Sequence, residues 1–483
     1  MESVLESQLS HRRHLEEARD QIADLLQHQA VERELITRAD SRGREDVLAS
    51  LVMRQQQVML EQRLTRFHPA DIAFVLEGLP LEARATAFGL VRPERRAAVL
   101  LEASEAVRVT LIQDRPAEEV AELLRPLDAD DIASLVAPLP DELRTEVLAR
   151  LDGAEQIEVR SALSFPADTV GAHMAFDFIT VRRDTTLEAV HRLLRIRGEL
   201  PPHTNQLFVV DRGNTLKGLL PVSALLVQQP ETGVADAMME KPVFFHTDDA
   251  MHEAISAFQK YDLLSAPVLN LQDQVVGRLR VDTVLDEVRR REESQSLALV
   301  GLPHGEDLYE PVAKSGRNRW PWLGLNVFTS FASSRVIGIF DDVIAQIAAV
   351  ATLIPIVASL GGNTGTQTME LVIRALALDK LGPAQLRRTF FKECMIAVLN
   401  GSVWGLALGA LTLVLYGKWK LSLVIYAAMI IELVVGAVAG VVIPVTLKRI
   451  GRDPIMGSSV LLTATTDTVG FFLLLGLATV FLL

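Results

Sequence analysis

Long apolar segments in the last third of the chain constrain its fold more than any other feature. A helix needs about 20 residues to cross the roughly 30 Å hydrocarbon core of a bilayer. Five segments are long enough and nearly free of charge; they cover about 320–341, 343–368, 394–417, 421–447 and 454–482. The sequence therefore predicts a polytopic α-helical membrane domain with five spans at 319–483, embedded in a lipid bilayer.

Charge differs between the two parts of the chain. Residues 314–483 contain 14 Lys and Arg against 8 Asp and Glu, a sum of +6, so residues 1–313 carry −19 within a total of −13. The single cysteine, Cys394, excludes an intrachain disulfide, which is compatible with a reducing cytosol. The first 20 residues lack the apolar core of a secretory signal. We expect the acidic part to stay in the cytosol.

Basic residues indicate the orientation of the spans. They lie before the first span, between the second and third, and between the fourth and fifth: Lys314, Arg317, Arg319, Lys380, Arg387, Arg388, Lys392, Lys448, Arg449 and Arg452. Cytoplasmic loops are enriched in Lys and Arg. We therefore expect a multi-pass protein of the cytoplasmic (inner) membrane with a cytosolic N-terminus and an external C-terminus.

Two carboxylates stand alone within the expected spans. Glu432 is the only charged residue in 421–447, and Asp467 is the only one in 454–482. A charged group at the bilayer centre costs about 2.5–3.5 kcal/mol on insertion scales and generally faces a water-filled or protein-lined path. We interpret Asp467 as part of a transport path. For Glu432, a pore or coupling role and pairing with a basic residue on a neighbouring helix stay equally open.

The segment 359–368, SLGGNTGTQT, brings amide and hydroxyl groups into the second span. It follows Pro355, which we expect to disrupt the helix and leave backbone groups unshielded. These groups are candidates for lining a path. The alternative is that Gly361 and Gly365 form a small-xxx-small pair that lets two helices approach closely, and the segment alone favours neither.

An internal repeat organises the first cytosolic domain. DIAFVLEGLPLEAR at 71–84 recurs sixty residues later as DIASLVAPLPDELR at 131–144. Each copy predicts an amphipathic helix, a Leu-Pro stop and a second helix that begins with acidic residues, the pattern of stacked helical hairpins. We predict an all-α helical-repeat superhelix at 61–164, preceded by a polar helical extension at 1–60.

A second duplication follows, with a different pattern. QLFVVDRGNTLKGLLPVSALL at 206–226 parallels SAPVLNLQDQVVGRLRVDTVL at 265–285, and each copy predicts strand, turn, strand and helix. Gly218 and Gly277 are expected in corresponding turns. We predict two α/β modules, at 165–228 and 229–288, which are typical of ligand-sensing or dimerising domains. A connecting helix is expected at 289–318.

The order of these domains resembles that of the MgtE family of magnesium channels, whose sensor modules are tandem CBS domains. The motifs that carry the resemblance are GGNTGTQ at 361–367, RALAL at 374–378, IP at 443–444, DP at 453–454 and TDTVGF at 466–471. The resemblance implies a homodimer around one pore that passes Mg²⁺, with Asp467 as the ion-selecting residue. Thr463 and Ser459, one and two turns earlier, would face the same path. From the second span, Gly361, Gly362 and Asn363 are the candidates.

The resemblance also implies cytosolic magnesium sensing, by carboxylates shared among the repeat domain, the second CBS module and the connecting helix. The candidate sensors are Asp262, Asp286, Asp453, Asp128 and Asp131, with Asp130 as a further contributor. The connecting helix departs from the family pattern, because it reads VDTVLDEVRRREESQS at 281–296 where relatives carry more acids. The expectation is weak magnesium gating. Glu287, Glu292 and Glu293 are possible replacements, but neighbouring arginines repel the ion and compete for them.

Nucleotide binding by the CBS modules is expected to be weak or absent. Adenosine-binding modules commonly carry Ser or Thr followed three residues later by Asp. This chain has Pro221 and Ala224 in the first module and Arg280 and Thr283 in the second.

The function classes narrow accordingly. No GxxxxGK[ST] phosphate loop occurs, so an active pump is disfavoured and no enzymatic activity or nucleic-acid partner is expected. A channel for Mg²⁺ is the first interpretation. A coupled secondary transporter of Mg²⁺, Mn²⁺ or Co²⁺, driven by protons or Na⁺, is the alternative that Glu432 keeps open.

Overall fold

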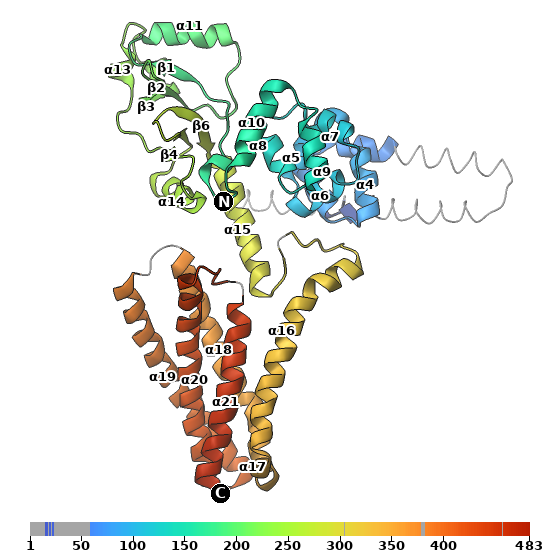
Figure 1. Ribbon diagram of the computed structural model, residues 1–483, viewed down its shortest axis with the longest axis vertical. Coiled ribbons are helices and arrows are strands. Elements are labelled where there is room, and N and C mark those ends of the chain that lie inside the picture. The colour runs from blue at the N-terminus through green and yellow to red at the C-terminus, as the bar shows by residue number, and fades with distance from the viewer. Residues whose placement is uncertain are drawn as a thin grey trace, which may run out of the picture. The chain divides into compact units, whose positions relative to one another are not determined.

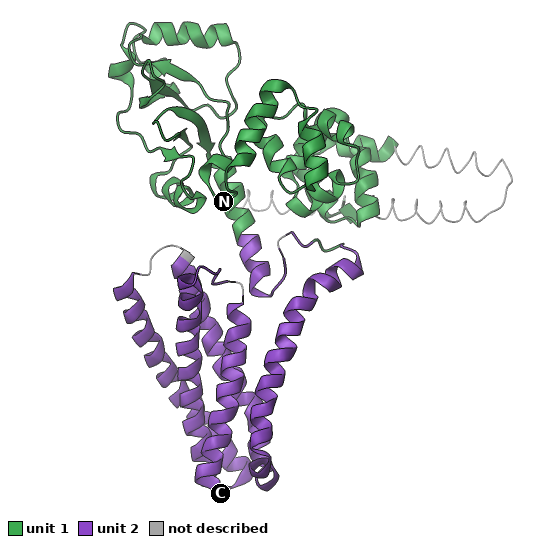
Figure 2. Ribbon diagram, in the orientation of Figure 1, with its two compact units in different colours: residues 1–291, 307–309 green, residues 292–306, 310–483 purple. Residues whose placement is uncertain are grey.

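The computed structural model describes residues 15–17, 19–20, 22–23, 58–303, 305–377, 382–455 and 457–483. The polar extension expected at 1–60 lies almost entirely outside the described residues. The chain forms two compact units, coloured separately in Figure 2. The first comprises residues 1–291 with 307–309, and the second comprises residues 292–306 with 310–483.

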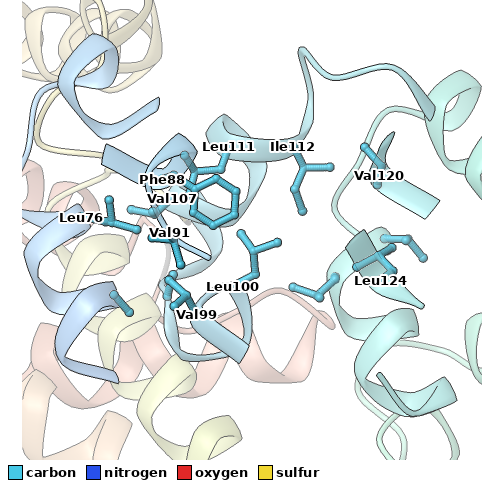
Figure 3. Close-up of a cluster of buried hydrophobic side chains, with 14 of the residues drawn as sticks. Leu76, Phe88, Val91, Val99, Leu100, Val107, Leu111, Ile112, Val120 and Leu124 are labelled. Carbon is cyan, nitrogen blue, oxygen red and sulfur yellow. The ribbon is translucent and has the colours of Figure 1, made fainter. Parts of the chain in front are cut away.

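Short helices build the first part of the first unit. They are α3 (Pro69–Glu77), α4 (Leu81–Gly89), α5 (Pro93–Glu102), α6 (Glu105–Ile112), α7 (Ala117–Leu124), α8 (Ala129–Val136), α9 (Asp141–Leu148) and α10 (Gly153–Ser164). Pro80 and Pro140 stand immediately before α4 and α9, which confirms the Leu-Pro stops. Side chains such as Leu76, Phe88 and Leu100 are fully buried between the helices (Figure 3). This layer of helices is the predicted helical-repeat domain.

Arginines complete the ends of these helices. Arg84 Nε donates to the carbonyl oxygen of Leu76 at 3.0 Å, and Arg144, its counterpart in the repeat, donates to Ala137 at 3.0 Å. Such bonds add a side-chain donor at helix C-termini, where carbonyls lack intrahelical partners. The carbonyl of Leu76 also accepts from the backbone N–H of Leu79 at 3.2 Å. Arg84 is fully buried and also holds Asp307 through its two terminal guanidinium nitrogens, Nη1 and Nη2. Residues 307–309 are thereby fastened to the helical domain, which the sequence did not predict.

The two α/β modules follow in the first unit. The first contains η1 (Val170–Ala172), β1 (Thr180–Arg182), α11 (Leu187–Arg197), β2 (Gln206–Val210), β3 (Leu216–Pro221) and α12 (Val222–Val227). The second contains α13 (Val234–Ala237), β4 (Phe245–His246), α14 (Met251–Tyr261), β5 (Ser265–Leu269), β6 (Val275–Arg280) and α15 (Val281–Leu299). Each sheet pairs its first two strands in parallel and its last two antiparallel, with an irregularity at the same place in both. The duplication is confirmed.

Gly218 and Gly277 were expected in turns, and this expectation is wrong. They lie within β3 and β6, where they pair with Val209 and Val268, and not in turns. A Cβ at Gly218 would lie 2.7 Å from the carbonyl oxygen of Met239, and one at Gly277 would lie 2.7 Å from Met174 Sδ. Glycine is needed there because another segment crosses the strand at close range.

The connecting helix also differs from its expected bounds. We expected it at 289–318, but α15 begins at Val281, directly after β6, and ends at Leu299. The chain then turns at Gly301, whose φ of +74° is a left-handed conformation that glycine tolerates. A new helix starts only after Pro311.

Long helices fill the second unit (Figure 1). They are α16 (Val312–Ile339), the short α17 (Asp341–Gln346), α18 (Ala348–Ala377), α19 (Pro383–Tyr416), α20 (Trp419–Arg449) and α21 (Ser458–Leu482). Within the described residues, four of them, α18 to α21, are long and apolar enough to span a membrane. The helix α16 is long enough, but its charged and polar residues lower its hydropathy, so the first expected span stays a prediction.

The helix α20 is the centre of the second unit, where it packs against α18, α19 and α21. The helix α18 continues without interruption through Pro355 and through 359–368. The expectation of a disrupted helix with unshielded backbone groups there is therefore wrong. Proline is tolerated because neighbouring helices and local adjustments supply partners for the carbonyl it leaves free.

Candidate functional site

The predicted path residues of the last span share one face of α21. Ser459, Thr463 and Asp467 follow one another at intervals of four residues. Asp467 is partly buried and Thr463 is exposed, with its hydroxyl bonded to the carbonyl of Ser459 at 2.9 Å. Ser459 Oγ donates to the carbonyl oxygen of Leu299, the last residue of α15, at 3.1 Å. Ser459 therefore links this polar face to the end of the connecting helix.

A cavity of about 730 Å³ opens beside Asp467. Its walls come from α16, α17, α18 and α21, and most of them are apolar. Ile337, Ile344, Ile354, Pro355 and Phe471 are among the lining residues, together with Ser359 and Asp341. Asp467 and Asp341 are the two carboxylates that line it. The site thus combines low-dielectric walls with negative charge, an arrangement that attracts cations.

The helix α18 presents a polar row to the surface of the single chain. Ser359, Asn363 and Gln367 follow at intervals of four residues and are exposed. Exposed polar side chains at membrane depth require either water or a protein partner. Ser359 lines the cavity that Asp467 also lines, so the two helices contribute polar groups to the same region.

The glycines of the second span pack against α20. A Cβ on Gly436 would lie 2.3 Å from the carbonyl oxygen of Gly361, and a Cβ on Gly440 would lie 2.5 Å from that of Gly365. The small-xxx-small interpretation of Gly361 and Gly365 is therefore confirmed. Gly362 lies nearer α21, with Thr466 Oγ1 at 3.7 Å from the position of its Cβ. Of the three candidates on this helix, Asn363 alone is exposed.

The carboxyl group of Glu432, a residue of α20, lies against Gly361 of α18 and Gly470 of α21. It is 0 % exposed, and neither carboxyl oxygen has a hydrogen-bond partner among the described residues. A Cβ on Gly361 would be 2.3 Å from Oε1, and one on Gly470 would be 2.8 Å from the carboxyl carbon. The pairing with a basic residue, one of the two interpretations of Glu432, is not found among the described residues.

The acidic residues of the helical domain meet an arginine of the second α/β module. Arg280 Nη2 lies 3.4 Å from Asp130 Oδ2, and its Nε lies 3.4 Å from Asp282 Oδ1. Burial, reinforced by the neighbouring charge of Asp131, raises the pKa of Asp130 to about 7. Burial also raises the pKa of Asp131, against the influence of Arg280. A protein cation thus occupies the centre of this carboxylate cluster.

A second arginine acts in the same region. Burial raises the pKa of Asp286, and the charge of Arg108 from the helical domain opposes this shift. Glu287 is buried and is held by Arg291 at 2.5 Å and Arg290 at 2.7 Å, so the expected competition of arginines is confirmed for Glu287. For Glu292 and Glu293 it stays a prediction. Among the described residues, no group of three or more Asp, Glu, His or Cys gathers closely enough to hold a metal ion.

The other candidate sensors lie at helix ends and in a turn. Asp262 ends α14 with φ of +50°, a left-handed conformation that Asp tolerates better than most residues. Asp453 accepts a bond from the backbone N–H of Ile455 at 2.8 Å in the turn before α21. Asp128 precedes α8 as its N-cap residue. In the first module, Pro221 is the N-cap of α12, and neither it nor Ala224 offers a polar side chain for a ribose.

Sequence reasoning missed two features of these sites. No functional role was expected for Asp341, although it lines the cavity with Asp467. The pairing of Arg280 with Asp130 joins residues 150 positions apart. In the sequence, Arg280 ends a predicted strand and Asp130 begins a predicted helix. Neither pattern indicates that these two residues form a contact.

Comparisons with known proteins agree with this architecture. Residues 354–477 match the family model MgtE, described as a divalent cation transporter; residues 67–168 match the MgtE intracellular N domain; and residues 170–229 and 234–290 match the CBS domain. The chain is 31% identical over 339 residues to the magnesium transporter MgtE of Thermus thermophilus, covering 68% of this chain and 73% of that protein. It is 25% identical over 421 residues to the MgtE of Bacillus subtilis, covering 87% and 93%.

Solved structures of cytosolic domains are also similar. A cytosolic domain of the Mg²⁺ channel MgtE in complex with ATP matches with 28% identity and a TM-score of 0.45, covering 50% of this chain and 98% of that one. The soluble part of a magnesium transporter matches with 19% identity and a TM-score of 0.43, covering 51% and 97%.

Proposed function

Because the chain belongs to the MgtE family of divalent cation transporters, we propose that it is a magnesium channel of the cytoplasmic membrane, built as a homodimer with one pore. The observation that carries the proposal is Asp467. It is the single charged residue of a membrane-spanning helix, shares a face with two hydroxyl side chains and lines a cavity. The acidic domains lie in the cytosol and the C-terminus lies outside, as the basic loops indicate.

Mg²⁺ chemistry fits this arrangement. The ion demands six ligands in octahedral geometry and gives up its water reluctantly. A pore with two carboxylates, one from each copy of Asp467, attracts the hydrated ion and binds its waters without replacing them. Thr463, Ser459 and Asn363 supply hydroxyl and amide groups for the same water shell. The exposed polar row of α18 supports a pore formed between two copies of the chain.

A coupled transporter is the second candidate, and Glu432 is the observation that favours it. A buried carboxylate without a partner is costly unless a cation or a proton joins it. In such a mechanism Glu432 binds the coupling ion while Asp467 binds the divalent cation.

Bilayer recordings on the purified full chain separate the two candidates. With equal pH on both sides and no Na⁺, a channel is expected to carry a steady Mg²⁺ current that follows the voltage. Repeating the recording with Mn²⁺ and Co²⁺ measures selectivity. Transport that occurs only with a proton or Na⁺ gradient, and that Glu432→Gln abolishes, would replace the channel by the exchanger.

We also propose that cytosolic Mg²⁺ gates this channel only weakly. Arg280 and Arg108 already supply positive charge where the acidic surfaces of the helical domain and the second module meet. A tethered guanidinium neutralises nearby carboxylates at any magnesium concentration and repels a divalent ion at the same place. The assembled cytosolic state is therefore expected without metal.

Protease protection of the purified dimer tests this proposal. The native chain is expected to be protected equally with and without Mg²⁺ into the millimolar range. Arg280→Gln removes the guanidinium nearest Asp130 and Asp282, so the protection of this variant should require Mg²⁺. Arg212→Gln is the control. The Arg212 side chain is 85% exposed, and the substitution removes only its 3.8 Å contact with Asp184. A sharp magnesium response of the native chain would contradict weak gating.

A further inference from the structure

The cavity beside Asp467 has a second carboxylate whose role is unassigned. We propose that Asp341 is an outer binding residue for the hydrated divalent cation, which it captures before the ion reaches Asp467. This inference rests on the proposed function and on the proposed orientation, in which the α16–α17 connection faces outward. The ligand is the cation with its water shell, bound without direct coordination to the protein.

The position of Asp341 is held by packing against α21. Phe340, the residue before it, has its ring 5.8 Å from that of Phe472, in an edge-on arrangement. Phe472 lies five residues beyond Asp467, which is about 7.5 Å along a helix. Ser333 and Thr468, whose hydroxyl oxygens are 2.8 Å apart, join α16 to α21 further along. In the proposed orientation, Asp341 therefore lies outward of Asp467 and lines the same cavity.

The cavity has the size and the electrostatics that a hydrated ion requires. Six water molecules at about 30 Å³ each occupy about 180 Å³, well within the cavity volume of about 730 Å³. Its isoleucine and phenylalanine walls provide no ligands that could strip the ion, and Mg²⁺ retains its waters in such surroundings. The cavity is open and Asp341 is exposed, so a hydrated ion can reach both carboxylates, whose attraction the apolar walls strengthen.

Asp341 forms no ion pair with any described residue. A structural alternative exists, because Asp341 and Asp342 both lie in the first turn of α17, where negative charge interacts favourably with the helix dipole. This alternative applies to both residues equally. Asp341 differs from Asp342 because it alone of the two lines the cavity. The neighbouring pair therefore provides a matched comparison within one helical turn.

Uptake of Mg²⁺ by intact cells that express the full chain, where only the outer face meets the added ion, tests the proposal. Asp341→Asn and Asp342→Asn each remove one charge from the same turn. We expect Asp341→Asn to raise the external concentration for half-maximal uptake about fivefold, with a nearly unchanged maximal rate. Asp342→Asn should stay close to native. The difference should shrink as ionic strength rises, because salt screens the attraction.

The possible results separate this inference from the proposed function. Equal half-maximal concentrations for the two variants, or a loss of maximal rate alone in Asp341→Asn, would overturn the role of Asp341. Both variants must be recovered from membranes in native amount and native size, and a third variant, Asp341→Glu, should restore the native half-maximal concentration if charge is the cause. Retained uptake by Asp467→Asn would instead refute the proposed pore.

Discussion

Asp467→Asn is expected to reduce divalent cation uptake by about 100-fold or more, the largest effect of any substitution considered. The change keeps the volume of the side chain and removes its charge, once in each copy of the proposed dimer. A doubly charged ion held a few ångströms from two carboxylates loses several kcal/mol of attraction when both are neutral, and about 1.4 kcal/mol corresponds to tenfold in binding. Initial rates of Mg²⁺ uptake into proteoliposomes measure the loss.

Normal assembly of Asp467→Asn and a second variant, Asp467→Glu, serve as controls for this experiment. The variant should fold and assemble like the native chain, since Asp467 has no ion pair with any described residue whose loss would destabilise it. Asp467→Glu keeps the charge on a longer side chain and should retain a measurable part of the uptake. Undiminished transport by the asparagine variant would exclude Asp467 as the selecting residue.

Gly436→Ala is expected to destabilise the membrane domain by about 1–3 kcal/mol or more, the usual range for forcing atoms into a packed interior. The new Cβ would lie 2.3 Å from the carbonyl oxygen of Gly361 and 3.2 Å from the backbone nitrogen of Gly365. Both neighbours are main-chain atoms, so no side chain can rotate away and α18 must move from α20. The melting temperature in detergent measures the loss.

Gly476→Ala is the matched control for that experiment. Gly476 lies in α21, and no atom within 4 Å would meet its new Cβ. Alanine is also the better helix former, so this variant should be as stable as the native chain or slightly more so. Equal melting temperatures for the two variants would show that α18 and α20 do not approach as closely as Gly361 and Gly436 indicate.

Sequence patterns predicted much of the architecture because they reflect interactions between residues that are close together in the chain. The Leu-Pro stops of the helical domain, the strand–turn–strand–helix units and the apolar spans each depend on residues close together in the chain. The same holds for the face shared by Ser459, Thr463 and Asp467, which follows from helical periodicity alone. Errors arose where a local rule was overridden by neighbours, as at Pro355, which α18 accommodates, and at Gly218, which lies in a strand.

Contacts between distant segments could not be predicted in this way. Glu432 appears in the sequence as an isolated acid. Only the packing of α18, α20 and α21 shows that it lies against Gly361 and Gly470, with no hydrogen-bond partner among the described residues. Asp341 and Asp342 are indistinguishable in the sequence, and the cavity separates them. In the sequence, Arg280 appears only as a departure from the nucleotide-binding motif. Only the fold shows that it pairs with Asp130.

The sequence by itself predicted the helical repeat, the duplicated strand–turn–strand–helix modules, four apolar spans, the family resemblance and the isolated carboxylate of the last span. These depend on hydrophobic burial and backbone preferences, which act over a few residues at a time. The tertiary structure alone decided which charges meet, which glycines separate helices and which carboxylates share a cavity. Those properties arise from distances between segments far apart in the chain, and electrostatic and packing energies change steeply with such distances.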